Sequence, residues 1–180
     1  IIMSIGLCYD TRESASFIKE SLIAGMSGDV HVYDAGILPT PALALVLKQK
    51  AEYHTGIVIS ASHNHYLDNG IKLFARCGQK IEEDDERIIE EYFSFFIQDS
   101  LTQDSFVQEK LSSISLLKRG LLVSWPEAFT LYKEYLCKAV DFNTTSLSIV
   151  LDCAHGATAY IAPEIFKTLG FSCIVLGNEP

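Results

Sequence analysis

Short apolar runs alternate along this chain with longer segments whose apolar residues recur every three or four positions. The runs have the length of buried strands, and the longer segments have the period of amphipathic helices. Strands that alternate with helices usually pair in parallel, so the order predicts an α/β fold: a three-layer α/β/α arrangement around a mostly parallel, mixed sheet. The expected strands cover residues 3–9, 30–33, 56–60, 71–75, 147–151 and 171–176. The expected helices follow Ser14, Thr40, Glu86, Pro126 and Gly156.

Two helix starts carry more specific signals. Ser14 is a residue type that caps helix N-termini through its hydroxyl. The acidic run at residues 82–86 suits a helix N-terminus because the helix dipole favours negative charge there. The apolar residues after that run predict a stripe that faces the core; they are Ile88, Ile89, Tyr92, Phe93, Phe96 and Ile97. Residues 100–124 have no clear period and predict irregular structure with one or two short strands.

The chain divides into two expected parts. Residues 1–125 are predicted to form a first domain that carries the candidate site, with Trp125 at a junction between elements. Residues 126–180 are predicted to be a linker helix and the truncated start of a second, similar α/β domain. A β-α-β unit of that length would bury little core by itself. We therefore expect the sequence to be a piece of a longer protein.

Composition excludes several classes of partner. The chain has 180 residues, is 48% apolar, and carries a formal net charge of -9. Phosphate backbones and acidic lipids attract clustered cations, so neither nucleic acid nor membrane is an expected partner. No apolar run approaches the roughly 20 residues that span a bilayer. Five scattered cysteines without a Cys-x-x-Cys pair are typical of reduced thiols, which predicts a cytoplasmic protein.

The densest group of reactive side chains lies in residues 60–72, between two expected buried strands. Loops at the carboxyl ends of parallel strands are where α/β proteins place their sites. A hydrolase would activate Ser62 with His63, but no Gly-x-Ser-x-Gly elbow is present. A metal site could use His63 and His65, although two ligands without a third are a weak signal. Phosphoryl transfer with a serine carrier and stabilising cations is the third possibility.

Residues 56–74, Gly-Ile-Val-Ile-Ser-Ala-Ser-His-Asn-His-Tyr-Leu-Asp-Asn-Gly-Ile-Lys-Leu-Phe, resemble the phosphoserine loop of the α-D-phosphohexomutases. Three further segments resemble family elements in family order: Asp-Thr-Arg at 10–12, Gly-Ile-Leu-Pro-Thr-Pro-Ala at 36–42, and Leu-Asp-Cys-Ala-His-Gly-Ala at 151–157. The loop variant with Ser-Ala-Ser at 60–62 is most similar to the bacterial phosphoglucosamine mutase branch of that family.

This resemblance implies an isomerase of the phosphohexomutase class. Its substrate would be a small phosphosugar, with glucosamine 6-phosphate and glucosamine 1-phosphate interconverted on the route to bacterial cell-wall precursors. The reaction would pass through a phosphoserine and a hexosamine 1,6-bisphosphate, and one Mg²⁺ ion would assist it. A homodimer is possible for the full-length parent.

The resemblance also assigns roles to residues of this chain. Ser62 would carry the phosphoryl group and, through that phosphate, bind the metal, whose other ligands would lie outside this chain. His63 and Lys72 would help to transfer protons and steady the phosphate. The expected supports of the phosphate or the loop are Arg12, Asn64, Asp68 and Asn69.

Some features depart from the family pattern. His65 stands where the family has proline, so the loop loses a fixed φ and gains a titratable ring. Cys8 and Tyr9 replace a Gly-Arg pair. The family's metal loop, sugar-recognition segment and phosphate-binding domain are not in this chain, which is therefore expected to be inactive alone. Two alternatives stay open: a phosphoglucomutase or phosphomannomutase, and a non-catalytic α/β module that binds phosphorylated ligands or a protein.

Overall fold

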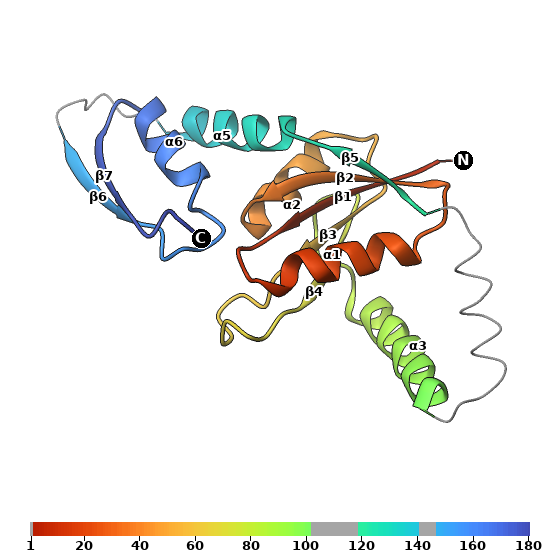
Figure 1. Cartoon of the computed structure of the whole chain (residues 1–180). Coiled ribbons are helices and arrows are strands. Elements are labelled where there is room, and N and C mark those ends of the chain that lie inside the picture. Colours follow the sequence, from red (N-terminus) through yellow and green to blue (C-terminus); the bar gives the residue numbers. More distant parts are fainter. Residues whose placement is uncertain (1, 102–118, 141–146) are drawn as a thin grey trace.

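The structure is a computed structural model that describes residues 2–101, 119–140 and 147–180. Its first part is built on a five-stranded sheet with strand order β4-β3-β1-β2-β5 (Figure 1). The pairs β1–β2, β1–β3 and β2–β5 are parallel, and β3–β4 is antiparallel. The strands are β1 Met3–Tyr9, β2 Val30–Ile37, β3 Thr55–Ile59, β4 Ile71–Ala75 and β5 Leu121–Ser124. The predicted mixed, mostly parallel sheet is confirmed.

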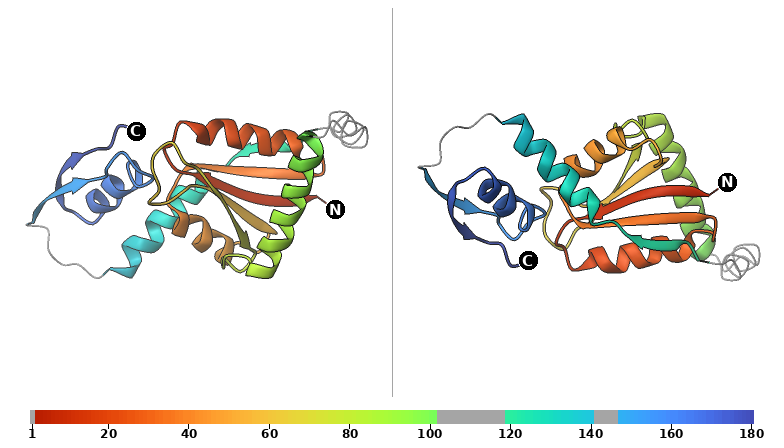
Figure 2. Two further views of the ribbon diagram at one scale, coloured as in Figure 1. Left: turned by 90° about the horizontal axis from the view of Figure 1, so that it is seen from below. Right: turned by 90° about the horizontal axis from the view of Figure 1, so that it is seen from above.

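Helices cover both faces of this sheet, which gives the predicted three layers (Figure 2). Helix α1 (Ser14–Gly25) covers one face, where Ile18 and Leu22 pack against the buried residues of β1 and β3. Helices α2 (Thr40–Gln49) and α5 (Glu127–Ala139) cover the other face and contact each other. The apolar period of each segment thus becomes burial against one side of the sheet.

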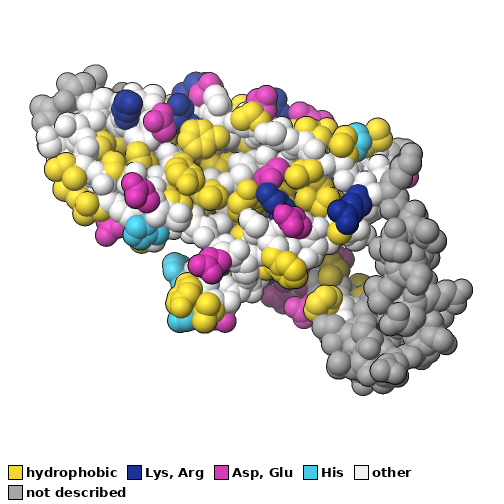
Figure 3. All heavy atoms as spheres, in the orientation of Figure 1, with side chains coloured by type: hydrophobic (Ala, Val, Ile, Leu, Met, Phe, Trp, Pro, Cys, Tyr) yellow, Lys and Arg dark blue, Asp and Glu magenta, His cyan; other side chains and the backbone are white. Residues whose placement is uncertain are grey.

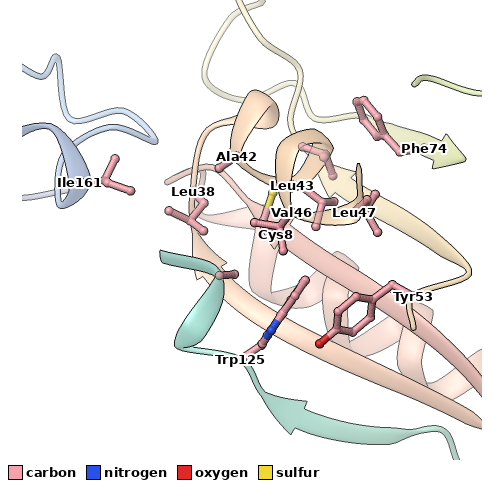
Figure 4. Packing of buried hydrophobic residues seen from close by; sticks show 12 residues of the cluster. Cys8, Leu38, Ala42, Leu43, Val46, Leu47, Tyr53, Phe74, Trp125 and Ile161 are labelled. Carbon is pink, nitrogen blue, oxygen red and sulfur yellow. The ribbon is translucent and has the colours of Figure 1, made fainter. Parts of the chain in front are cut away.

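The larger core cluster lies between the sheet and α2 (Figure 4). Leu43 and Leu47 of α2 are fully buried there. Trp125, which directly follows β5, is buried beside Tyr53 with ring centroids 4.2 Å apart, and beside Tyr33 at 6.2 Å. The prediction that Trp125 packs at a junction is confirmed, since the residue lies between β5 and α5 and its ring packs against Tyr33 of β2 and against Tyr53.

Two expectations about helices are wrong. Ser14 is the first residue of α1 instead of its cap, and the preceding Glu13 makes no side-chain capping bond. Helix α3 (Glu83–Leu101) forms after the acidic run, but it extends away from the sheet in Figure 1. Tyr92 and Phe93 are about two-thirds exposed, so the expected core-facing stripe is not buried. The side chains of Phe96 and Ile97 lie outside the described part of the structure. Of residues 100–124, expected to be irregular with one or two short strands, residues 102–118 lie outside the described residues, and β5 forms one short strand at 121–124.

Residues 147–180 form a small C-terminal unit. It contains β6 (Ser148–Asp152), α6 (Ile161–Thr168) and β7 (Ser172–Leu176), with the two strands parallel. Ile161 is 1% exposed and belongs to the larger core cluster of the first part. Helix α6 also contacts α5, so this unit is attached to the five-stranded sheet through buried contacts.

Across the described ranges, no helix combines the length and apolar character that crossing a bilayer requires.

Candidate active site

Residues 60–70, here called the Ser62 loop, connect the carboxyl end of β3 to β4. A backbone bond from the Ser60 N–H to the Gly70 carbonyl, 2.8 Å long, closes the base of the loop. The loop projects from the body of the molecule, with histidine and hydrophobic side chains at its tip (Figure 3). His63, His65, Tyr66 and Leu67 are all exposed. Paired strands of the sheet therefore fix both ends of a loop whose reactive side chains face solvent.

Ser62 is held in a strained backbone conformation. Its φ is 55°, in the left-handed region that residues other than glycine adopt rarely. Its N–H donates to the Ser60 hydroxyl at 3.1 Å, and Ser60 is itself buried. The Ser62 side chain is exposed, and its Oγ is in contact with Nζ of Lys72 on β4. The structure thus brings together two of the three residues expected to take part in the chemistry.

Arg12 lies beneath the loop. Its guanidinium donates to the carboxylate of Asp10 at 3.0 Å, and only 10% of its side chain is exposed. The same group donates to backbone carbonyls of the loop: at Asp68 (2.8 Å), Asn64 (3.0 Å), Ser62 (3.1 Å) and His65. The turn after β1 is therefore tied to the whole length of the loop.

The remaining predicted supports contribute differently. The Asn69 amide donates to the Ser14 hydroxyl at 2.9 Å, and its oxygen accepts the Gly70 N–H at 2.8 Å. This use of the Ser14 hydroxyl links the loop to the first turn of α1. Asn64 and Asp68 have exposed side chains, and their N–H groups donate to the carbonyls of Ala61 and His65. Both residues shape the loop through their backbone.

A cleft of about 880 Å³ opens beside Ser62. The loop, the turn after β1, the start of α2 and the C-terminal unit all line it, with His63 and His155 among the lining residues. The Thr11 hydroxyl donates to the His155 carbonyl at 2.6 Å across the two parts. Ala154 and His155 both have positive φ, 47° and 51°. The sequence did not identify His155 as a cleft residue, because it and Ser62 line the same cleft only in the fold.

Lys19 and Asp34 lie near Cys8 and Tyr9, the two residues that replace the family's Gly-Arg pair. Lys19 donates to Asp34 at 2.9 Å and to the Tyr9 hydroxyl at 3.2 Å. Burial opposes the charge on Lys19, but these two partners outweigh it and raise the pKa of the amine. Burial, followed by the nearby carboxylates of Asp34 and Asp10, raises the pKa of the Cys8 thiol. Cys8 is thus an unreactive core thiol, and Lys19 places a cation beside Tyr9.

The described residues do not form a metal site by themselves. No group of three or more His, Cys, Asp or Glu side chains among them could hold an ion. Ser62 is exposed and could add one phosphate oxygen to a site completed elsewhere.

The chain is similar to known proteins of one family. The family profile described as phosphoglucomutase/phosphomannomutase, alpha/beta/alpha domain I, matches residues 3–95. Phosphoglucosamine mutase of Dictyoglomus turgidum is 36% identical over 171 residues, which cover 94% of this chain and 36% of that protein. Phosphoglucosamine mutase of Renibacterium salmoninarum is 39% identical over 173 residues, 95% of this chain and 35% of that protein. The chain thus spans about a third of the length of these curated relatives.

Solved structures support the fold. A phosphoglucomutase/phosphomannomutase family protein from Burkholderia thailandensis superposes with a TM-score of 0.69 at 20% identity, over 98% of this chain and 36% of that one. The profile match contains β1 to β4 and the entire Ser62 loop. The chain therefore belongs to the phosphoglucomutase/phosphomannomutase family, whose α/β/α domain I it carries.

Proposed function

We propose that this chain is the phosphoserine-carrying part of a phosphoglucosamine mutase, which interconverts glucosamine 6-phosphate and glucosamine 1-phosphate. The observation that carries the proposal is the contact between the exposed Ser62 hydroxyl and Lys72 at the edge of the cleft. A serine ester stores a phosphoryl group between turnovers, and an adjacent cation stabilises the oxygen from which that group leaves. The two curated relatives described above, both phosphoglucosamine mutases, support the choice of sugar.

The step on this chain is a transfer between two oxygens. The bond from phosphorus to Ser62 Oγ breaks as a bond from phosphorus to a sugar hydroxyl forms. The sugar hydroxyl loses its proton to a base, for which His63 in the cleft lining is the candidate. Lys72 supplies a proton to Ser62 Oγ as that bond breaks. Transfer of the other phosphoryl group back to Ser62 reverses these movements and completes the isomerisation.

The proposed reaction also needs a metal ion, a bisphosphorylated sugar and protein segments that are not part of this chain. A Mg²⁺ ion bound through the phosphate on Ser62 would neutralise charge as a second anionic phosphate approaches. Hexosamine 1,6-bisphosphate would be the intermediate and the source of the first phosphoryl group. Segments of the full-length protein outside these 180 residues would supply the other metal ligands and the groups that select the sugar.

The test is a mutase assay of the full-length gene product on glucosamine 6-phosphate, glucose 6-phosphate and mannose 6-phosphate, with Ser62→Ala as the matched variant. We expect the highest kcat/KM with the glucosamine substrate and no turnover by Ser62→Ala. A preference for glucose or mannose would assign another branch of the family. Turnover that survives Ser62→Ala would contradict the phosphoserine route.

A further inference from the structure

Arg12 uses its complete hydrogen-bonding capacity within the protein. A guanidinium carries five N–H donors. Nε donates to Asp10, Nη1 donates to the carbonyls of His65 and Asp68, and Nη2 donates to those of Ser62 and Asn64. Five donors therefore meet five acceptors. The side chain is nine-tenths covered, and the ion pair with Asp10 fixes its plane.

The carbonyls that Arg12 holds are distributed along the loop. They belong to Ser62 and Asn64 before the tip of the loop and to His65 and Asp68 at and after it, and all four point to the Arg12 guanidinium. Four carbonyl dipoles brought this close repel one another, and the cation offsets that repulsion. Ser62 lies at one end of this arrangement with its strained φ of 55°. Such a conformation persists only where the surroundings hold it. Arg12 holds the Ser62 carbonyl while the Ser60 hydroxyl holds its N–H, so both polar groups of the residue are fixed.

A phosphate oxygen could bond to Arg12 only by displacing one of these carbonyls. Lys72, in contrast, presents its amine directly at Ser62 Oγ. We propose that Arg12 is a positioning residue that fixes the loop backbone so that the Ser62 hydroxyl faces Lys72 and the cleft, and that Arg12 does not itself bind phosphate. Only the purpose of this positioning rests on the proposed function; the restraint on the loop does not.

Lysine cannot replace arginine in this role. An ammonium group has three donors and no planar fork, so it cannot reach four separated carbonyls and Asp10 together. A phosphate ligand, in contrast, is often replaced by lysine with partial retention of binding, because lysine binds phosphate as a point charge. Arg12→Lys therefore separates the two roles, and Lys72→Met is the matched control that removes a cation beside Ser62 without touching the carbonyls.

The first test measures hydrogen–deuterium exchange of the peptide that covers residues 61–70 in the 180-residue chain. We expect exchange about tenfold faster in Arg12→Lys, unchanged exchange in β1 and β3, and unchanged loop exchange in Lys72→Met. Asp10→Asn, which keeps the cation but loses the group that orients it, should give a smaller increase in the same peptide. Unchanged loop exchange in both Arg12→Lys and Asp10→Asn would overturn the proposal, whatever the activity of the protein.

The second test compares kcat with KM in the full-length gene product. Arg12→Lys should lower kcat about 100-fold, the scale of a misplaced reacting group, while KM for the phosphosugar stays within about threefold. A rise in KM of about tenfold or more with an ordered loop would make Arg12 a phosphate ligand and overturn the proposal. A wild-type protein without mutase activity would contradict the proposed function instead, and the exchange measurement would still decide the role of Arg12.

Discussion

The Nζ atom of Lys72 contacts the Oγ atom of Ser62, although the two residues belong to different elements. Antiparallel pairing of β3 with β4 places Lys72 opposite Val58, one residue from the end of β3. The loop then folds back from the end of β3, so the hydroxyl of Ser62 lies beside Lys72 of β4. The proposed chemistry depends on this relationship.

Replacement of Lys72 by methionine keeps most of the side-chain length but removes the charge. Transfer of a phosphoryl group from Ser62 should slow by about 100- to 1000-fold, because no cation stabilises the departing oxygen. Quenched-flow mass spectrometry of the phosphorylated full-length gene product measures the rate. Lys48→Met, on the exposed side of α2, is the control and should leave the rate unchanged. Equal rates in wild type and Lys72→Met would remove Lys72 from the mechanism.

Gly78 is expected to be the glycine least tolerant of substitution among those in the turns of the first part. Its φ is +79°, and a Cβ built there would lie 2.1 Å from the Ala44 carbonyl oxygen. Gly78→Ala should lower the free energy of unfolding by about 3 kcal/mol, since strain and overlap add. Gly25→Ala, where a Cβ meets nothing within 4 Å at the end of α1, should be neutral or slightly stabilising. Urea unfolding followed by Trp125 fluorescence compares the two, and similar midpoints would contradict the packing of this turn.

Attachment of the C-terminal unit can be tested through two isoleucines. Ile161 of α6 is buried in the core of the first part, whereas Ile174 of β7 is 64% exposed. Ile161→Ala should lower the free energy of unfolding by about 2–5 kcal/mol, and Ile174→Ala by less than about 1 kcal/mol. If Ile161→Ala changes stability no more than Ile174→Ala, α6 does not pack on that core in solution.

The alkaline limit of stability should depend on Tyr53. Burial, with Glu52 nearby, raises the pKa of the phenol to about 12, above its ordinary value near 10. The unfolded chain therefore releases this proton first as the pH rises, so the free energy of unfolding falls above about pH 10. Tyr53→Phe should reduce that fall by about 1 kcal/mol between about pH 9 and about pH 11. Tyr135→Phe, at an exposed tyrosine of α5, should not alter it.

The sequence predicts the sheet and the loop well because both depend on local signals. The apolar run of β3 ends at a polar segment rich in turn residues, so the loop containing Ser62 could be placed between two strands from composition and order alone. The roles of Ser62, His63 and Lys72 came from the family resemblance and stay predictions until they are measured.

Contacts between residues that lie far apart in the chain could not be predicted from the sequence. The apolar period of α3 predicts an amphipathic helix but cannot specify whether another element covers its stripe, and Tyr92 and Phe93 are exposed. Ser14 has the chemistry of a cap, yet its hydroxyl accepts from Asn69 of a loop 55 residues away. The approach of His155 to Thr11 likewise depends on how the C-terminal unit meets the turn after β1.

The most direct measurement of the central claim is mapping of the transferred group. The full-length gene product is incubated with glucosamine 1,6-bisphosphate labelled in its phosphates. One half of the sample is digested and sequenced by mass spectrometry at once, and the other half is chased with unlabelled glucosamine 6-phosphate before it is digested and sequenced. The account predicts one labelled phosphoryl group, on Ser62, which the chase transfers to the sugar. Label on another residue, or a phosphoryl group on Ser62 that the chase does not remove, would contradict it.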